Sequence, residues 1–340
     1  MQVEELLPGI YRIPVALEGS PLRVLNSYVI CGDLKGNGTR NLLVDTGFRT
    51  DACKKAIRDG LDAIGISMED TDILLTHFHV DHSGNASDLI CDGNKIYIGE
   101  NDRKYLVAFP GEENSKYAAD GLLRFRAERF MQHGISEEMI ADMTKSVPSK
   151  KMAIDPGFLR YTTLKDGERI QAGPYKLHAI ETPGHTRGHM CYEIEGTGAM
   201  ILGDHVLFDI TPNITDWPDT EDSLGDYLNS LDKISRYDVT LPLPAHRETG
   251  DFYARVAKIR EHHERRLDEC CRVIRELGKA KLYDITGRMK WRIRTDSWDT
   301  FPSAQRWFAL GECLSHIDYL VNRGVIRRCE EDGLIWYENI

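Results

Sequence analysis

The feature that most constrains this chain is a histidine-rich turn, residues 76–84, that follows the short apolar run 72–75. An apolar run of this length predicts a buried strand, and a turn leaving a strand can direct several side chains at one point. Imidazole nitrogen and carboxylate oxygen are ligands of zinc and related divalent ions. The turn therefore predicts a metal site. Its possible ligands are His77, His79, Asp81 and His82.

Other apolar runs in the chain are also followed by a histidine or an aspartate. Three of these residues lie downstream of the turn and one lies upstream: His185, Asp204, His246 and Asp45. A solvated polar loop is the alternative interpretation of the histidine-rich turn, because histidine tracts also occur on surfaces. The repeated placement after apolar runs is what loops at strand ends would show. It favours a dinuclear metal site over a polar loop.

The order of these residues resembles the motifs of the metallo-β-lactamase superfamily. Those motifs are an Asp at a strand end, H-x-H-x-D-H, a His, an Asp and a final His, and this chain has all five in order. The resemblance implies that the first metal is bound by His77, His79 and His185. It implies that the second metal is bound by Asp81, His82 and His246. It implies that Asp204 bridges the two metals. Asp45 resembles the carboxylate that orients the ligand loops without binding metal.

Length and composition agree with a protein of two domains. The chain has 340 residues, of which 41% are hydrophobic, so it can bury a large core. We expect a metallo-β-lactamase domain at residues 1–252 and a helical, winged-helix-like domain at 253–340. No apolar run has the length of a membrane span, and the first residues lack the pattern of a signal peptide. The eight cysteines show no regular framework, so we expect reduced thiols and a cytoplasmic protein without a membrane partner.

The order of expected elements predicts an α/β fold. Residues 9–15 and 22–30 are typical of strands that open a mixed sheet, and residues 50–64 of an amphipathic helix. A second group of strands is expected at residues 93–99, 173–181, 190–195 and 200–202. The resemblance implies an αββα sandwich with the metal site at the edge of its two sheets.

A helical insert is expected at about residues 101–151, between the first histidines and His185. It carries aromatic and apolar side chains among charged residues: Phe109, Tyr117, Phe125, Phe130 and Met131. We interpret the insert as a cap near the metal site that gives apolar walls to a substrate pocket. The alternative is that these side chains pack the insert onto the sheet or form a dimer contact, since aromatic residues at helical spacing usually belong to a core.

The residues after His246 predict a small separate unit. A helix is expected at 254–277 and another at 303–322, and an Asp-Gly turn at Asp332 predicts a hairpin of residues 324–329 and 334–338. Helices followed by a hairpin resemble a winged helix. With His262-His263-x-x-Arg266 after the last metal histidine, the chain resembles the branch that contains beta-lactamase-like protein 2.

That branch includes an endoribonuclease, so nucleic acid is a possible partner. In residues 255–294 thirteen lysines and arginines stand against six acidic residues, and such a stretch attracts phosphates. Against this, the net charge of the chain is −11, and the presumed recognition helix carries Glu312 and Asp318. Nucleic acid is therefore not the favoured partner, and a winged helix used for packing or for a homodimer is preferred.

The chemistry expected of the site is hydrolysis by a hydroxide that bridges two metal ions. We expect zinc, with iron or manganese as alternatives, because this ligand set accepts all three. Asp81 is expected to hold the hydroxide in line. The favoured partner is a small acyl substrate, namely a thioester, an ester or a lactone. The alternatives are a metal-dependent endoribonuclease or phosphodiesterase, a nucleic-acid-binding or scaffold protein with a structural metal centre, and an iron protein of the persulfide dioxygenase type.

Overall fold

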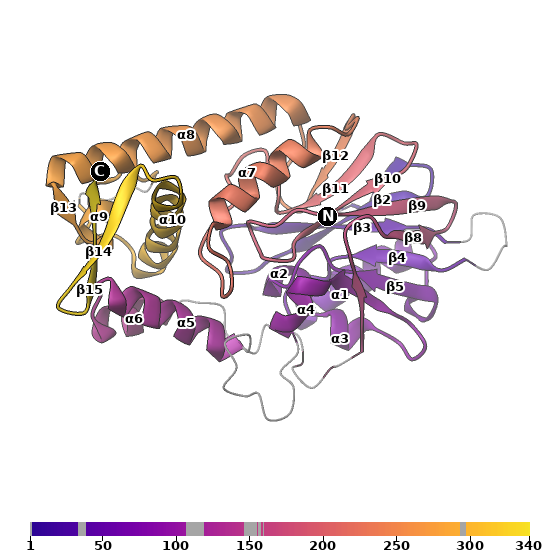
Figure 1. The fold of residues 1–340 in the computed structure, drawn as a ribbon. Coiled ribbons are helices and arrows are strands. Elements are labelled where there is room, and N and C mark those ends of the chain that lie inside the picture. Colours follow the sequence, from indigo (N-terminus) through magenta and orange to yellow (C-terminus); the bar gives the residue numbers. More distant parts are fainter. Residues whose placement is uncertain are drawn as a thin grey trace. The chain divides into compact units, whose positions relative to one another are not determined.

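The computed structural model describes residues 2–32, 39–106, 119–145, 155, 158, 160–292 and 297–340. The chain divides into two compact units. The first, here called the sandwich unit, comprises Met1–Glu113, Pro148–Pro212 and Ser230–Val256. The second, here called the helical unit, comprises Asn114–Val147, Asn213–Asn229 and Ala257–Ile340. Figure 1 labels most elements of both.

Among the described residues, the sandwich unit has one sheet of seven strands in the order of the sequence. The first four pair antiparallel, and the pairs from β4 to β7 are parallel. The strands are β1 (Glu4–Leu7), β2 (Ile10–Ala16), β3 (Val24–Ile30), β4 (Asn41–Val44), β5 (Thr71–Leu74), β6 (Ile96–Gly99) and β7 (Tyr161–Leu164).

The second sheet of this unit has, in the described residues, five strands in the order β12-β11-β10-β9-β8. Its β11 and β12 pair parallel, and the other pairs are antiparallel. The strands are β8 (Arg169–Ala172), β9 (Tyr175–Glu181), β10 (Met190–Ile194), β11 (Ala199–Gly203) and β12 (Leu241–Pro244).

Alternating side chains of the first sheet face two different cores. Leu42 and Leu74 pack against residues of the second sheet, among them Leu177 and Tyr192. Their neighbours Leu43 and Ile73 lie in another cluster, together with residues of the flanking helices. Because side chains in a strand alternate between faces, each strand contributes to both layers. The predicted mixed αββα sandwich is confirmed.

Short helices cover the outer face of the first sheet. In α1 the buried residues Cys53, Ile57 and Leu61 recur at helical spacing, and the Thr50 hydroxyl accepts a hydrogen bond from Cys53 N at 3.3 Å as the N-cap. The helices and the 3₁₀ turn that begin in this unit are α1 (Asp51–Ala63), η1 (Met68–Asp70), α2 (Val80–Ser83), α3 (Ala86–Leu89), α4 (Glu100–Leu106) and α8 (Phe252–Leu277). The last of these continues into the helical unit.

The helical unit is built from helices and a small sheet. Its described strands form the order β13-β15-β14, with β14 and β15 as a hairpin. At the hairpin turn Asp332 and Gly333 both have positive φ, as a two-residue type I′ turn requires. The elements are α5 (Ala119–Gln132), α6 (Glu137–Thr144), α7 (Ser223–Ile234), which ends in the sandwich unit, β13 (Lys279–Ala280), α9 (Leu282–Arg288), α10 (Ser303–Asn322), β14 (Ile326–Glu331) and β15 (Leu334–Asn339).

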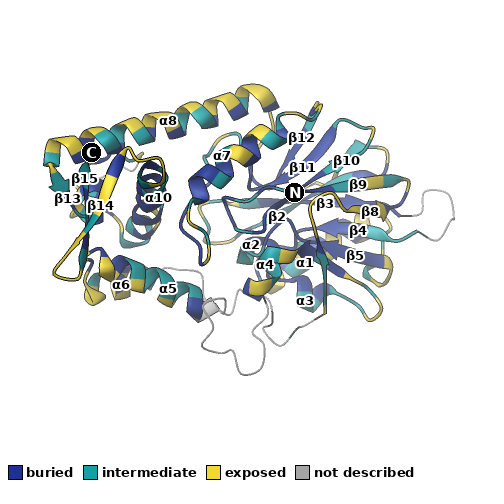
Figure 2. Ribbon diagram, viewed as in Figure 1, coloured by how far each residue is buried: buried dark blue, intermediate teal, exposed yellow. Residues whose placement is uncertain are grey.

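Helices α5 and α6 of the insert belong to the core of the helical unit. Phe130 and Met143 are fully buried in one cluster with Val273, Leu310 and Tyr337. Helix α10 of this unit is coloured mostly as buried in Figure 2. The unit boundaries thus differ from the predicted ones, because the apolar side of the insert packs with the C-terminal helices. Two aromatic residues of the predicted insert, Phe109 and Tyr117, lie outside the described residues. A role for the insert as a cap over the substrate stays a prediction, and so does the winged helix.

No helix among the described residues is both long and apolar enough to cross a membrane. A cytoplasmic location stays a prediction.

Candidate metal centre

The histidine-rich turn leaves the end of β5 and closes into α2. The Ser83 hydroxyl donates a shared hydrogen bond to the backbone oxygens of Phe78 and His79, at 2.8 and 3.1 Å. This bond fixes the turn between His79 and the single helical turn that carries Asp81 and His82. Four side chains of possible ligands are thereby held within a few residues of one strand end.

Four other strand ends supply the remaining predicted residues. Asp45 follows β4, His185 follows β9, Asp204 follows β11 and His246 follows β12. Strands β4 and β5 run parallel in one sheet, and β11 and β12 run parallel in the other. Because the carboxyl ends of parallel strands lie at the same edge, each sheet presents its residues on one side.

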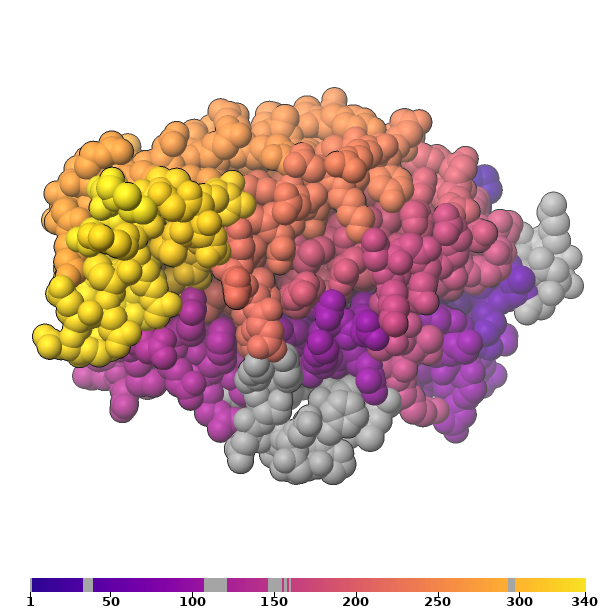
Figure 3. All heavy atoms as spheres, viewed as in Figure 1, coloured from indigo at the N-terminus to yellow at the C-terminus, as the bar shows by residue number. Residues whose placement is uncertain are grey.

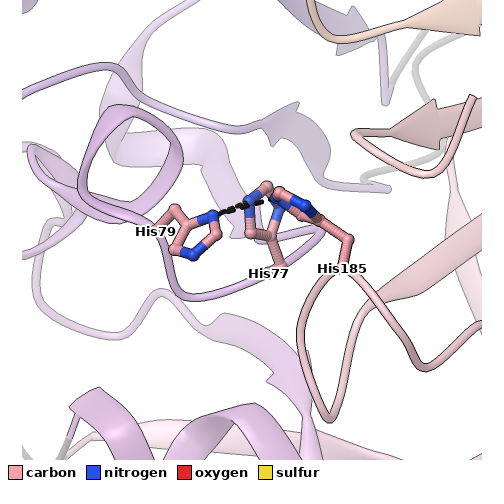
Figure 4. A group of neighbouring side chains, drawn as sticks. All are labelled: His77, His79 and His185. Atoms are coloured by element: carbon pink, nitrogen blue, oxygen red, sulfur yellow. Dashed lines mark hydrogen bonds between the residues drawn. The ribbon is translucent and has the colours of Figure 1, made fainter. Parts of the chain in front are cut away.

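Three histidines converge on one point (Figure 4). His77 Nε2 and His185 Nε2 lie 2.9 and 3.0 Å from the same atom, His79 Nδ1. A ring nitrogen carries either one proton or one lone pair in the ring plane, so it cannot form a good hydrogen bond with both. Nitrogens about 2.0 Å from a tetrahedral ion would lie about 3.3 Å apart. The three histidines therefore fit ligands of one cation.

A second group of side chains adjoins the first. His246 Nε2 lies 3.3 Å from His82 Nε2, 3.5 Å from Asp81 Oδ2 and 3.4 Å from Asp204 Oδ1. Asp204 Oδ2 lies 3.6 Å from His185 Nε2, an atom of the first group. The two carboxylate oxygens of Asp204 thus face different groups, as the predicted bridging position requires. All seven predicted ligands are brought together.

The donor atoms of this second group fit a cation as well. Asp204 Oδ1 is buried and accepts no hydrogen bond from the described residues, although histidine nitrogens surround it. A buried carboxylate oxygen without a donor is costly unless a cation satisfies it. His246 Nδ1 lies 2.8 Å from the carbonyl oxygen of Val24, to which it donates. In the neutral form of the ring, which is the form that binds a metal, Nε2 therefore carries the lone pair, and it faces the site.

Asp45 lies directly behind the ligands. Its carboxylate accepts hydrogen bonds from Thr76 N at 2.9 Å, from the Thr76 hydroxyl at 2.8 Å and from His82 Nδ1 at 2.8 Å. The last bond fixes the His82 ring with Nε2 toward Asp81 and Asp204. This is the orienting contact that a metal-binding histidine usually makes.

Burial and charge set the protonation of the site. Burial lowers the pKa of His77 far below its usual range and that of His79 to about 3, with further lowering by neighbouring histidines. Both rings are thus neutral at pH 7, which is the form that binds metals. Burial alone would raise the pKa of Asp81, but His82 and His246 outweigh it and lower this pKa to about 2. Asp81 is therefore ionised.

The residues that form this site lie within a segment that is typical of one protein superfamily. The sequence profile of the Metallo-beta-lactamase superfamily matches residues 21–246, which include every predicted site residue. The chain belongs to this superfamily. The predicted family, the sandwich fold and the prediction of a hydrolase are confirmed, and a divalent-metal site follows at the level of the family.

Relatives of this chain within the superfamily include fungal proteins. It is 22% identical to Lactamase-like protein adaB of Aspergillus niger, with 91% of this chain and 89% of that protein covered. It is 24% identical to Atrochrysone carboxyl ACP thioesterase AacuM of Aspergillus aculeatus, covering 85% of this chain and 71% of that protein. Among solved structures, a metallo-beta-lactamase family protein of Thermus thermophilus is 26% identical, with a TM-score of 0.78, and covers 99% of this chain and 100% of that chain.

One supporting residue of the candidate metal centre was not among those predicted. His189 Nε2 accepts a hydrogen bond from Asp204 N at 3.1 Å, and its Nδ1 lies 2.8 Å from the Thr182 hydroxyl. A Cβ at Gly203 would lie 2.5 Å from His189 Nε2, so glycine permits this close contact. The second histidine of Gly184-His185-Thr186-Arg187-Gly188-His189 was the available signal, but sequence alone does not distinguish it from a core histidine.

Proposed function

We propose that this member of the metallo-β-lactamase superfamily hydrolyses a small acyl substrate and that the substrate is a thioester. The observation that carries the proposal is the convergence of seven histidine and aspartate side chains on two adjoining groups, with Asp204 facing both. A relative of 24% identity is named a thioesterase, and this favours a thioester over an ester or a lactone.

The two groups would hold two divalent ions. The first ion would be bound by His77, His79 and His185, the second by Asp81, His82 and His246, with Asp204 between them. Zinc suits these nitrogen and oxygen donors, and iron or manganese are the alternatives. When bound, such ions lower the pKa of a water molecule toward neutrality, so that hydroxide is available at pH 7.

Asp81 is the residue proposed to act on the reacting water. Its carboxylate is ionised and lies 3.5 Å from His246 Nε2, so it can accept a hydrogen bond from the water and orient it. In the reaction a carbon–oxygen bond forms at the acyl carbonyl and the carbon–sulfur bond breaks. The leaving sulfur takes the proton that the water loses when it becomes hydroxide, so it leaves as a thiol. The acyl group leaves as a carboxylic acid, which releases the second proton of the water to solvent and becomes a carboxylate. No serine or cysteine nucleophile is needed.

Nucleic acid is the weaker candidate for the substrate. Helix α10, the presumed recognition helix, is buried along most of its length from Trp307 to Leu320, so it offers little free surface to a groove. It packs against α6 and α9. The hairpin turn at residues 330–332 is exposed and acidic, and acidic groups repel phosphate. Figure 3 shows the C-terminal segment, in yellow, at the surface.

The basic character of α8 is also reduced by its own acidic residues. Arg265 pairs with Glu261 at 2.7 Å, Arg266 with Glu269 at 2.7 Å and Arg272 with Glu276 at 2.8 Å. This helix therefore lacks a continuous positive face, which the contact with a phosphate backbone would need. A winged-helix unit that serves packing or a homodimer remains our preferred interpretation.

The test is a comparison of substrates on the metal-loaded full chain. Acyl-CoA thioesters, lactones and structured single-stranded RNA are offered to the wild type and to the variants Asp81→Ala and His185→Ala. His178→Ala is the matched control, because this partly buried histidine pairs with Glu193 on the neighbouring strand. We expect thioester hydrolysis in the wild type and the control, and a loss of about 100-fold or more in both site variants.

RNA cleavage that is lost in the same two variants, together with no hydrolysis of any acyl substrate, would overturn the proposal. Hydrolysis of lactones alone would refute the proposal that the substrate is a thioester, but would agree with a small acyl substrate. Thioester hydrolysis that survives in His185→Ala would show that the predicted site does not catalyse it.

A further inference from the structure

A buried carboxylate outside the predicted ligand set joins two of the loops that carry it. Asp102 lies in the first turn of α4, directly after β6, and is 0% exposed. Its Oδ2 accepts hydrogen bonds from Phe78 N at 3.1 Å and from the Thr186 hydroxyl at 2.7 Å. Its Oδ1 accepts one from Gly188 N at 2.6 Å. One side chain thus accepts three hydrogen bonds from two loops that are distant in sequence.

The positions of these donors relate Asp102 to the histidines of the first metal. Phe78 stands between His77 and His79 in the sequence, and Thr186 follows His185. A movement of either loop by about 1 Å would stretch at least one of the three bonds beyond hydrogen-bond range. The spacing between His79 Nδ1 and His185 Nε2, 3.0 Å, is therefore tied to the position of Asp102.

The second loop also lies in direct contact with the start of α4. A Cβ at Gly188 would lie 2.3 Å from Asp102 N, and a Cβ at Gly99 would lie 2.3 Å from the carbonyl oxygen of Gly188. Two glycines therefore permit a backbone approach that any side chain would prevent. The loop of His185 is held against α4 by sterics as well as by hydrogen bonds.

The contacts of Asp102 make it an unusual residue to bury. All three donors that reach it are neutral, and no cation pairs with it among the described residues. Burial raises the pKa of this carboxyl to about 7, and the three hydrogen bonds only partly oppose the rise. A carboxylate buried without a cation opposes stability. A role in the site gives a reason for its presence.

We propose that Asp102 is a positioning residue that sets the distance between the loops of His79 and His185 and so preorganises the three histidines for the first metal ion. The inference rests on the proposed function only in assuming that these histidines bind a metal. The three hydrogen bonds of Asp102 reach neighbours of the ligand residues and not the ligand side chains, so its effect is expected in metal affinity before it is expected in catalysis.

The experiment measures zinc affinity by competition with a chromophoric chelator, beside thermal unfolding of the metal-free protein. Asp102→Asn keeps the size of the side chain. Asparagine has only one acceptor oxygen, whereas the three donors now bind to both carboxylate oxygens of Asp102. The matched control is Asp72→Asn, because Asp72 is also nearly buried and accepts from Arg40 Nε at 2.8 Å and from Lys95 N at 3.0 Å. Asp72 lies on β5, and its contacts are with residues outside the site.

We expect Asp102→Asn to weaken the binding of the first zinc ion by about 10- to 100-fold, the range found for outer-shell partners of metal ligands. Asp72→Asn is expected to keep wild-type affinity, even where its metal-free form melts at a lower temperature. Wild-type zinc affinity in Asp102→Asn, or an equal loss in both variants, would overturn the inference.

A second pair of variants decides the matter if Asp102→Asn does not fold. Thr186→Val removes one donor to Asp102, and Thr186→Ser keeps it. We expect weaker zinc binding in the valine variant and near wild-type binding in the serine variant, and equal affinities would refute the inference. A wild-type protein that binds no metal would refute the proposed function itself, so the two failures are distinguishable.

Discussion

At the scale of single residues, the site depends on carboxylates that fix histidine rings. Asp45 has φ +57°, a left-handed conformation that aspartate and asparagine adopt more readily than most residues. From this position it accepts hydrogen bonds from Thr76 and from His82 Nδ1. Nδ1 of His82 then donates a hydrogen bond to Asp45, and Nε2 on the other side of the ring is placed to bind a metal ion.

Replacement of Asp45 by asparagine tests this orienting role. Asparagine tolerates the same backbone conformation but cannot accept all three hydrogen bonds, so the His82 ring is less well fixed. We expect Asp45→Asn to weaken binding of the second metal ion by about 10- to 100-fold, with the fold retained. Metal affinity and circular dichroism check this. Wild-type affinity for both ions in the variant would show that His82 needs no such partner.

At the scale of elements, the helical insert is joined to the C-terminal hairpin. Directly after α5, His133 Nδ1 donates to the carbonyl oxygen of Arg129 at 2.6 Å, and His133 Nε2 accepts from the Tyr337 hydroxyl of β15 at 2.7 Å. Burial lowers the pKa of His133 to about 4. The folded chain therefore holds this histidine neutral, between a carbonyl acceptor and a hydroxyl donor.

The lowered pKa of His133 predicts a dependence of stability on pH. Between about pH 6.5 and about pH 4 the unfolded chain binds a proton that the folded chain does not. The contribution of the neutral His133 to the free energy of unfolding is therefore fully present above about pH 6.5. It falls as the pH falls, by at most about 1.4 kcal/mol per pH unit and about 3 kcal/mol in total. Urea unfolding of the full chain at several pH values measures it.

His133→Leu is expected to flatten this slope, and Tyr337→Phe, which keeps the titrating ring, is expected to retain most of it. An unchanged slope in His133→Leu would mean that other groups cause the dependence.

The sequence predicted those elements whose signals are local. The expected helix at 303–322 coincides with α10, because its apolar residues recur at helical spacing between Pro302 and Gly324. The hairpin followed from the Asp-Gly turn. The packing of the insert was not predictable, because Phe130 meets Trp307, with ring centroids 5.1 Å apart, only in the folded chain.

The same distinction holds for the residues of the site. The seven possible ligands and Asp45 were found because each follows an apolar run, which marks a strand end. Asp102 also comes soon after a strand, but it was not singled out, since an acidic residue in the first turn of a helix is usually explained by the helix dipole. Its partners, Thr186 and Gly188, lie 84 and 86 residues away in the sequence.

At the scale of the whole molecule, folding and metal binding are expected to be coupled. The proposed ligands come from four loops of the sandwich unit, between residues 77 and 246, so no short segment could form the site alone. An ion that binds the folded chain and not the unfolded one adds to stability by mass action. Removal of metal should therefore lower the stability of the chain and abolish its chemistry together.

The most direct test of the central claim is a titration of the metal-free full chain with zinc, in which bound metal and thioester hydrolysis are measured on the same samples. The proposed two-metal mechanism predicts no hydrolysis without metal and a rate that rises until two ions are bound per chain. Full activity in the metal-free protein, or two bound ions with no turnover of any acyl substrate, would contradict it.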